Sequence, residues 1–254
     1  SVLHELEQLI LPSTLQAIRL TTHMSDVVQL EYLPEKITSE DYKAYYDRLM
    51  FGFSGYVAAL QAYLSSDEPD TLLAEVLAHF DDYRILTAIR HGPLGLKQLN
   101  QQIEKRLLQQ LASYTTQQGD WYVGRAVMMT YNDYQLGLSN GDIGLCLQRF
   151  KDGQWQFEVY FSSLEKWLPA ARLPKNIETA FALTIHKSQG SEFKHSAVVL
   201  DGAAANLLSQ ELLYTAITRA KSVVSILADP KSLQQALTVK TTRQSGLKNK
   251  LKTT

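Results

Sequence analysis

The amino-acid sequence predicts an α/β protein in which a doubly wound sheet is interrupted by a small antiparallel barrel. Three observations lead to this fold class. Residues 83–111 read as an apolar strand, a turn rich in glycine and proline, and an amphipathic helix, which together form the repeating unit of a doubly wound sheet. Residues 119–178 read as short strands separated by turn residues, a pattern typical of a small barrel. From residue 180 onward the alternation of strand and helix returns.

The first part of the chain, to about residue 118, is predicted to be mostly helical. Residues 39–41, Ser-Glu-Asp, can begin a helix whose apolar and aromatic residues recur at helical spacing as far as Tyr63. An aromatic stripe of this kind is more often part of a core than a platform for base stacking, so we expect it to be buried. The further elements expected here are a helix over 71–80, a strand over 83–89 and a helix over 96–111.

The middle of the chain changes to glycine-punctuated strands. Asn132–Tyr134 and Ser139–Asp142 supply turn chemistry, and the Asn-Gly pair within the second is a strong hairpin signal. We expect both segments to act first as turns. The strands expected here cover 125–130, 143–147 and 155–160.

The last part of the chain returns to α/β texture. Strands are expected over 180–185, 196–201 and 223–227, with a helix over 208–219 between the last two and another helix after Pro230. Beyond Asp229 the tail contains only basic charged residues. Such a run is usually a solvated end, although it can also meet phosphate or a partner. Its members are Lys231, Lys240, Arg243, Lys248, Lys250 and Lys252.

Composition describes an ordinary soluble globular chain of 254 residues, with 45% hydrophobic and 20% charged residues. The net charge of -1 gives no overall attraction to nucleic acid, so a DNA site would have to be a local basic surface. The single cysteine, Cys146, excludes an intramolecular disulfide and a multi-cysteine zinc site, and favours a cytoplasmic location. No apolar run approaches membrane-spanning length, and we expect no signal peptide.

Two segments concentrate the polar residues that chemistry would need. The apolar strand that begins at Ala180 stops in a polar loop, and open α/β sheets bind ligands at the carboxyl ends of strands. The second segment, Leu213–Lys221, is a helix end that carries Arg219. The loop presents Thr184, His186, Lys187, Ser188, Gln189, Gly190 and Glu192.

These two segments resemble motifs V and VI of superfamily 1 helicases. The wording T-x-H-K-x-Q-G-x-E, followed by Y-T-A-x-T-R-A, is similar to the branch that contains RecD, the alpha subunit of exodeoxyribonuclease V. The resemblance implies a RecA-like motor domain, called 2A, interrupted by an SH3-like barrel, called 2B. The implied boundaries are 1–118 for the first part of 2A with a helical N-terminal region, 119–178 for 2B, 179–238 for the rest of 2A, and 239–254 for a basic tail.

The resemblance also implies roles for nucleotide-binding residues. Arg219 would be an arginine finger that stabilises charge developing on the γ-phosphate. Gly190 and Glu192 would face the nucleotide, with Glu192 accepting a hydrogen bond from a ribose hydroxyl. Ala88–Gly95 resembles motif IV, which would place Arg90 by the nucleotide cleft. The alternatives are a helix-end arginine at 219 that interacts with the dipole, and a surface arginine at 90 that caps a strand end.

The same resemblance implies a single-stranded DNA site. In domain 2B, Asn132–Tyr134 and Asn140–Asp142 match the family's pattern, which gives proximity to DNA as a second possibility beside their role as turns. Thr184 and His186 would donate hydrogen bonds to the DNA backbone, with Lys187 and Gln189 nearby. Contacts of this kind position the strand without reading its sequence, so binding would be sequence-independent and salt-sensitive. A histidine or threonine at a strand end is more often structural when it stands alone, but the cluster favours a functional role.

The sequence lacks the G-x-x-x-x-G-K-[ST] loop that cradles phosphates, so we expect this chain to be inactive as an ATPase alone. Without that loop, Asp201 reads as a strand-end residue rather than a Walker B carboxylate. The implied parent is a 5′→3′ DNA helicase of a recombination-repair nuclease that uses ATP and Mg²⁺, both held mainly by an N-terminal motor domain. The implied partners are single-stranded DNA and the beta and gamma subunits of exodeoxyribonuclease V.

Two other function classes stay open. A non-enzymatic module would use the barrel and the basic tail to bind DNA or a partner subunit. A hydrolase is less favoured, because His186 and His195 lack metal-ligand spacing and Cys146 lies within an apolar strand. Self-association of the isolated chain is a further hypothesis, which rests on the N-terminal apolar residues Ile10, Leu11, Leu15 and Ile18.

Overall fold

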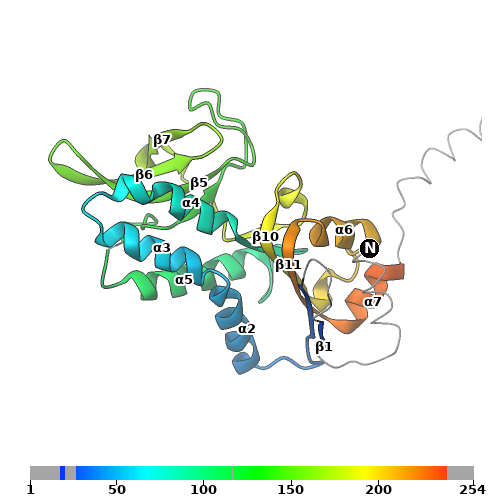
Figure 1. Ribbon diagram of the computed structural model, residues 1–254. Helices are drawn as coiled ribbons and strands as arrows, with labels where there is room; N and C mark the ends of the chain where they lie inside the picture. The colour runs from blue at the N-terminus through cyan, green and yellow to red at the C-terminus, as the bar shows by residue number, and fades with distance from the viewer. Residues whose placement is uncertain (1–17, 21–26, 116, 239–254) are drawn as a thin grey trace, which may run out of the picture. The chain divides into compact units, whose positions relative to one another are not determined.

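The computed structural model describes residues 18–20, 27–115 and 117–238, and these form two compact units (Figure 1). The first unit contains the described residues of 1–38 and 184–254, together with 85–95. The second contains 39–84 and 96–183. The apolar residues Ile10, Leu11 and Leu15 and the predicted tail 239–254 lie outside the described residues, and the predicted domain boundaries stay predictions.

The first unit is built on a six-stranded sheet with the order β1-β2-β11-β10-β3-β9, whose last two strands run across the boundary between the units. β11 pairs in parallel with both β2 and β10, whereas β1 pairs antiparallel with β2. This arrangement confirms the predicted α/β class with a parallel sheet. The bounds are β1 (Ile18–Leu20), β2 (Val27–Tyr32), β3 (Tyr83–Thr87), β9 (Ala182–Thr184), β10 (Phe193–Leu200) and β11 (Ala220–Ala228).

Burial explains why β10 reads as a continuous apolar run rather than an alternating one. All five residues from Ser196 to Leu200 are buried, which is the pattern of a strand covered on both faces. The predicted helix 208–219 forms as α6 (Gln210–Ile217), and Ser209 caps it by accepting a hydrogen bond from the Leu212 amide at 3.1 Å. The last helix is α7 (Pro230–Thr238), which begins at the predicted proline.

The second unit begins with helices, and here one prediction is wrong. The apolar spacing predicted one helix through Tyr63, but the chain forms two helices that break at Gly52 and Phe53. A Cβ atom at Gly52 would lie 2.1 Å from Cζ of Tyr83, so packing of a distant residue fixes this close approach. Of the aromatic residues in the predicted stripe, Tyr45, Tyr46, Phe53 and Tyr63 are buried and Tyr42 is half-buried, which confirms its core role. The helices are α2 (Ser39–Phe51), α3 (Ser54–Ser65), α4 (Leu73–Asp81) and α5 (Leu96–Leu111), with the 3-10 helix η1 (Pro69–Leu72) before α4.

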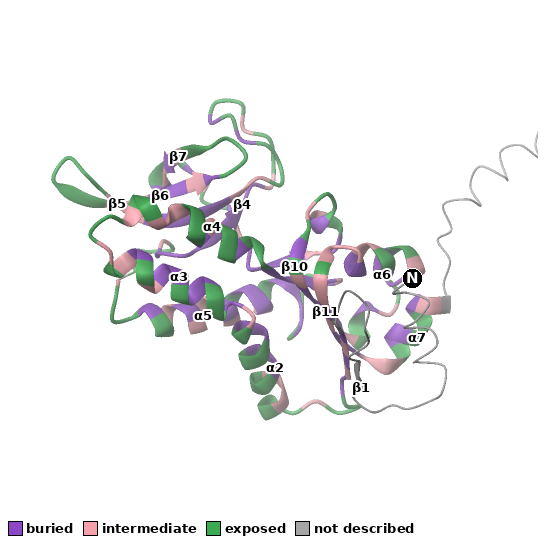
Figure 2. Cartoon of the chain, in the orientation of Figure 1, coloured by how far each residue is buried: buried purple, intermediate pink, exposed green. Residues whose placement is uncertain are grey.

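The same unit contains a five-stranded antiparallel sheet with the order β7-β6-β5-β4-β8. Its core includes Val127, Cys146, Val159 and Phe161, and Figure 2 shows buried residues along β4 while the turn between β5 and β6 is exposed. The three predicted strands are present; whether the sheet is SH3-like stays a prediction. The bounds are β4 (Ala126–Met128), β5 (Ile143–Lys151), β6 (Gln154–Phe161), β7 (Lys166–Pro169) and β8 (Glu178–Thr179).

The predicted strand 180–185 forms only in its middle, as β9 (Ala182–Thr184). β9 belongs to the six-stranded sheet, whereas β8 ends at Thr179 and pairs with β4 in the antiparallel sheet. Ala180 and Phe181 connect the two and are fully buried, and the Ala180 amide still donates to the Ala126 carbonyl of β4 at 2.8 Å. A continuous apolar run carries no signal for the point where the chain leaves one sheet and joins the other, so only tertiary pairing shortens the strand.

The loop between β4 and β5 uses the predicted turn residues. Oδ1 of Asp133 accepts hydrogen bonds from the amides of Gln135 and Leu136, at 3.1 and 3.0 Å. Oδ1 of Asn132 accepts from the Asn140 amide at 2.8 Å. These side-chain oxygens accept hydrogen bonds from backbone amides of the loop, which confirms the role of Asn132 and Asp133 as turn residues.

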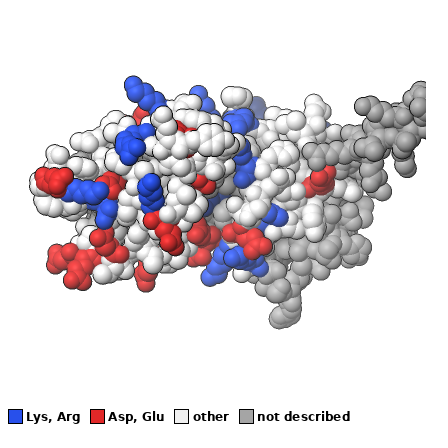
Figure 3. Space-filling view, turned by 90° about the horizontal axis from the view of Figure 1, so that it is seen from above, with Lys and Arg blue, Asp and Glu red and all other residues white. Residues whose placement is uncertain are grey.

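Surface charge is mixed in sign on the face that Figure 3 shows. Figure 3 shows acidic and basic side chains interspersed on the face in view. This mixture agrees with the net charge of -1. Within the described part of the chain, no helix is long and apolar enough to cross a membrane.

Candidate functional site

The candidate site lies in the first unit, where two segments that are distant in sequence meet. One is the loop between β9 and β10, which contains the 3-10 helix η3 (His186–Ser188). The other is the link between α6 and β11, which contains Arg219. The amide of Phe193, at the start of β10, donates to the carbonyl of Arg219 at 2.8 Å, and Phe193 pairs with Ala220 in the sheet. The sheet register therefore brings the two predicted motifs together.

The Arg219 guanidinium is half-buried and is positioned by three hydrogen bonds. Nε donates to the Thr215 carbonyl at 3.0 Å, Nη1 to the Ser191 carbonyl at 3.2 Å, and Nη2 to Oγ1 of Thr218 at 3.1 Å. A guanidinium has five N–H donors, so two are left without a partner among the described residues. No described carboxylate lies within 4.0 Å to neutralise the charge. The site therefore holds a positive charge, and two N–H groups of the Arg219 guanidinium are available to bind a ligand.

The loop beside Arg219 is a tight turn pinned by Ser188. Its hydroxyl donates to the Ile185 carbonyl at 2.6 Å, and its own carbonyl accepts from the Ser191 amide at 3.0 Å. Gly190 has a φ of +81°, in the left-handed region, although a Cβ there would meet nothing within 4 Å. The backbone conformation, rather than lack of space, thus favours glycine, and it leaves the backbone open to close approach.

The four predicted DNA residues lie together on this turn. Oγ1 of Thr184 accepts from the Lys187 amide at 3.3 Å, and the His186 carbonyl accepts from the Gln189 amide at 3.3 Å. The side chains of His186 and Gln189 are exposed, whereas those of Thr184 and Lys187 are half-buried. The structure therefore groups these residues on one loop, with two polar side chains exposed.

Glu192 is exposed and lies near one cation. Its Oε2 is 3.9 Å from Nζ of Lys221, and both side chains are more than half exposed. Surface pairs of this kind contribute about 0–1 kcal/mol, so the carboxylate is not strongly held. Ser191, whose carbonyl binds Arg219, directly precedes it, which brings Glu192 into the same site.

Arg90 is exposed on the turn that follows β3. This turn is connected to the candidate loop, because the Thr87 carbonyl accepts from the Ile185 amide at 3.0 Å. The Thr87 hydroxyl in turn donates to the Leu94 carbonyl at 3.0 Å. The backbone of the turn that carries Arg90 thus adjoins the loop.

The position of the site relative to the strands differs from the simple expectation. Thr184 lies at the carboxyl end of β9, as predicted. Gly190 and Glu192 instead precede the amino end of β10, and Arg219 precedes the amino end of β11. The sequence reasoning also missed Ser191, Thr215 and Thr218, which position Arg219. The position of Thr215, four residues before Arg219 on a predicted helix, was the available signal.

The structure gives little support to a metal or thiol site. No group of three His, Cys, Asp or Glu residues in the described ranges is placed to hold a metal ion. Burial raises the pKa of the Cys146 thiol to about 12, so it is a poor nucleophile. Burial lowers the pKa of His195 to about 4, and its Nε2 lies 2.6 Å from Oγ of Ser225 on the neighbouring strand. The burial of Cys146 therefore disfavours it as the nucleophile of a hydrolase.

Comparison with known proteins agrees with this geometry. Residues 179–227, which include the candidate loop and Arg219, match the UvrD-like helicase C-terminal domain. The RecD subunit of the RecBCD enzyme of Haemophilus influenzae is 41% identical over 172 residues, which are 68% of this chain and 25% of that protein. The ATP-dependent RecD2 DNA helicase of Deinococcus radiodurans is 32% identical over 164 residues, which are 62% of this chain and 22% of that protein.

A solved structure titled as two Pif1 helicases coordinating DNA unwinding at forked dsDNA is matched with a TM-score of 0.41. The identity is 16%, over 79% of this chain and 52% of that one. The predicted resemblance to RecD is confirmed by the sequence matches. The chain spans about a quarter of the length of the curated relatives described above.

Proposed function

We propose that this chain, which is similar to the C-terminal part of RecD subunits, is the C-terminal motor half of an ATP-dependent 5′→3′ DNA helicase subunit. The observation that carries the proposal is the hydrogen bond between Arg219 and the carbonyl of Ser191. It joins the helix end that carries the candidate finger to the loop that carries the candidate DNA contacts. A motor needs this kind of connection, because nucleotide chemistry must change the grip on DNA.

The residues present fit one wall of an ATP site. Arg219 offers a positive charge and two further N–H donors, Gly190 leaves its backbone open, and Glu192 offers an exposed acceptor. When bound, ATP supplies the phosphoryl group that is transferred to water. Arg219 would stabilise the charge that develops on the γ-phosphate, and Glu192 would accept from a ribose hydroxyl. Arg90 would lie by the same cleft.

The remaining parts of such a site fall outside this chain. Its sequence contains no phosphate-cradling G-x-x-x-x-G-K-[ST] loop, and its described residues contain no cluster suited to a metal ion. The ATP phosphates and Mg²⁺ would therefore be held mainly by another motor domain of the parent protein. For that reason we expect the isolated chain to have no ATPase activity.

The loop would grip single-stranded DNA through its backbone phosphates. Thr184 and His186 would donate hydrogen bonds, with Lys187 and Gln189 beside them. If Arg219 moves toward a phosphate, it weakens its bond to the Ser191 carbonyl, and the turn pinned by Ser188 can shift. The DNA contacts on that turn would then change with nucleotide state, which supports stepwise movement along one strand.

The parent protein would work in DNA recombination and repair. RecD is named as a subunit of the RecBCD enzyme, and by analogy this chain would assemble with the beta and gamma subunits of exodeoxyribonuclease V. The five-stranded antiparallel sheet, which we propose to be an SH3-like domain 2B, would contact DNA or one of these subunits. Nuclease activity would belong to a partner.

Arg219 provides the decisive experiment. In the parent protein, Arg219→Ala should lower DNA-stimulated ATP turnover by about 10³-fold or more while ATP affinity, measured separately, changes little. Arg219→Lys should fail to restore turnover, because an ammonium group lacks the planar fork. Arg48→Ala, at an exposed arginine of α2, is the matched control and should retain turnover.

Unchanged turnover in Arg219→Ala would contradict the motor role and make Arg219 a structural helix-end residue. The alternative of a non-enzymatic DNA- or partner-binding module would then be favoured. ATP hydrolysis by the isolated chain, above a control with Arg219→Ala, would contradict the expected dependence on another motor domain.

A further inference from the structure

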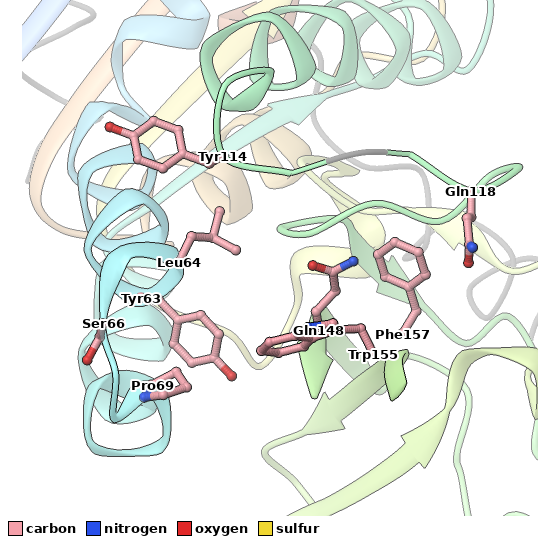
Figure 4. Close-up of a pocket in the computed structure, with 9 residues that line it drawn as sticks. All are labelled: Tyr63, Leu64, Ser66, Pro69, Tyr114, Gln118, Gln148, Trp155 and Phe157. Atoms are coloured by element: carbon pink, nitrogen blue, oxygen red, sulfur yellow. The ribbon is translucent and has the colours of Figure 1, made fainter. Parts of the chain in front are cut away.

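The second unit contains a cavity of about 490 Å³ that the proposed motor role does not use. Its walls come from the end of α3, η1, the segment after α5, and strands β5 and β6 (Figure 4). Four of the nine lining residues are aromatic and two carry side-chain amides. The residues that matter below are Tyr63, Tyr114, Gln118, Gln148, Trp155 and Phe157.

A buried phenol points into this cavity without a partner. Tyr63 is only 3% exposed, and its hydroxyl has no hydrogen-bond partner among the described residues. Figure 4 shows the hydroxyl directed toward the side of the cavity where Trp155 and Gln148 lie. Burial, with a smaller contribution from Asp70, raises the pKa of Tyr63 to about 12, so the hydroxyl stays protonated. A buried hydroxyl without a partner is costly, so an incoming polar group that binds it would be stabilised.

The opposite wall offers stacking surface and further donors. Trp155 is 62% exposed and makes an edge contact with exposed Phe150, with ring centroids 5.5 Å apart. Oε1 of Gln148 accepts from the Thr115 hydroxyl at 3.3 Å, which leaves its amide N–H groups to donate elsewhere. Exposed aromatic surface beside a cavity with convergent polar groups is typical of a binding site.

Charge near the cavity disfavours a phosphate backbone. Residues 67–70, Asp-Glu-Pro-Asp, border it at η1 and contribute three carboxylates. Arg149 and Lys151 lie 3.4 and 2.8 Å from the oxygens of buried Glu158, and Nη2 of Arg149 also lies 3.9 Å from Oδ2 of Asp70. The four carboxylates, those of residues 67–70 and of Glu158, outnumber these two cations. The rim is therefore acidic and complements a positively charged ligand.

We infer that this cavity binds a short extended segment of a partner polypeptide that carries an apolar side chain followed closely by Lys or Arg. The apolar side chain enters between Tyr63 and Trp155. Peptide carbonyl groups accept hydrogen bonds from the Tyr63 hydroxyl and the Gln148 amide. The basic side chain pairs with Asp70, whose carboxylate is 73% exposed and lies 3.9 Å from Nη2 of Arg149, a separation that leaves room for a second, closer cation. This inference is independent of the proposed motor role, because it uses no residue of the Arg219 site.

The test uses this chain and fluorescein-labelled nonapeptides in a Gly-Ser frame. Each peptide has a central Trp, Leu or Pro, followed two residues later by Lys or Glu, and binding is measured by anisotropy. At least one Lys peptide should bind more than about 10-fold more tightly than its Glu counterpart, because the rim is acidic. Asp70→Asn should reduce that preference, whereas Glu165→Gln, at an exposed carboxylate on another turn, should preserve it.

Variants of the cavity separate binding from folding. Trp155→Ala should weaken the Lys peptide more than about 10-fold, as loss of an aromatic anchor does. Tyr134→Ala, which removes a 90% exposed aromatic elsewhere in the unit, should have no effect. Tyr63→Phe deletes only the hydroxyl and should weaken binding about 2- to 12-fold, the loss expected for one hydrogen bond.

Three results would overturn the inference. One is that no peptide of the set binds with a Kd below about 1 mM, the weak end of measurable affinity. Another is that Lys and Glu peptides bind equally. The third is that oligo-thymidylate binds and loses more affinity than the peptides in Trp155→Ala, which would make the cavity a nucleobase site.

Discussion

At the scale of single residues, two buried tyrosines differ in whether the hydroxyl has a hydrogen-bond partner, and this difference decides what each hydroxyl contributes to stability. Tyr56 and Tyr63 both lie on α3 and are both at most 3% exposed. The Tyr56 hydroxyl donates to the Gly124 carbonyl at 2.8 Å, whereas the Tyr63 hydroxyl has no described partner. Burial raises the pKa of both, so both are neutral donors at ordinary pH. They differ in whether the hydroxyl donates a hydrogen bond to another described residue.

This contrast predicts opposite responses to the same change. Tyr56→Phe should lower the free energy of unfolding by about 1–2 kcal/mol, because it leaves the Gly124 carbonyl unsatisfied. Tyr63→Phe should leave it unchanged or raise it by up to about 1 kcal/mol, because it removes an unpaired buried oxygen. Urea denaturation of the two variants beside wild type measures both. Equal losses in the two would contradict the assignment of Tyr63 as unpartnered.

The same scale explains why Arg84 tolerates burial. It is 1% exposed, and its guanidinium lies 3.7 Å from the centre of the Phe80 ring and donates to the carbonyls of Phe80 and Tyr83. Burial lowers the pKa of Arg84 to about 10, although Asp81 counteracts this. The group stays charged at neutral pH because ring and carbonyl contacts replace water.

At the scale of elements, one side chain connects α5 to the chain just before the candidate site. Asn100 is buried on α5, and its Oδ1 accepts from the amides of Phe181 and Ala182, both at 2.9 Å. Its Nδ2 donates to the Ala182 carbonyl at 3.2 Å. These bonds satisfy backbone groups at the start of β9, which leads to Thr184.

Removing this side chain should therefore be costly. Asn100→Ala should lower the free energy of unfolding by about 2–4 kcal/mol, since it leaves two amides and one carbonyl of the buried backbone without partners. Asn100→Asp should also destabilise, because it keeps the acceptor but loses the donor and buries a charge. Gln101→Ala on the same helix, at an exposed position, should change stability by less than about 1 kcal/mol. Denaturation curves that superimpose for Asn100→Ala and Gln101→Ala would exclude this role for Asn100.

At the scale of the whole molecule, overall charge does not determine DNA binding. The net charge is -1, and acidic and basic side chains are interspersed on the face seen in Figure 3. Any affinity for DNA must then come from a few local contacts. The loop 184–189 offers one lysine and one histidine, so we expect weak binding with a shallow salt dependence.

Lys187 provides the test of this local origin. Lys187→Ala should weaken binding of single-stranded oligonucleotides by the parent protein to the same extent whatever their sequence. It should also reduce the slope of log K against log salt by about one charge equivalent. Lys43→Ala, at an exposed lysine of α2, should leave the slope unchanged. Anisotropy titrations at several salt concentrations measure the slope. An effect of Lys43→Ala equal to that of Lys187→Ala would indicate nonspecific attraction instead.

The sequence by itself determined the elements whose signals are local. α5 forms over the predicted 96–111, because its apolar residues recur at helical spacing between a glycine turn and a polar segment. The turn roles of Asp133 and Asn132 also follow from short-range side-chain chemistry. Recognition of the motifs around Gly190 and Arg219 likewise needed only the order of residues.

The tertiary structure alone decided the features that depend on distant contacts. Tyr83 packs against Gly52 at the break between α2 and α3. β8 and β9 are separate strands because they pair with different sheets. The bond from Arg219 to Ser191 and the cavity at Tyr63 likewise join residues far apart in the chain. Local periodicity contains no information about such partners, because burial and hydrogen bonding are settled only when the elements pack.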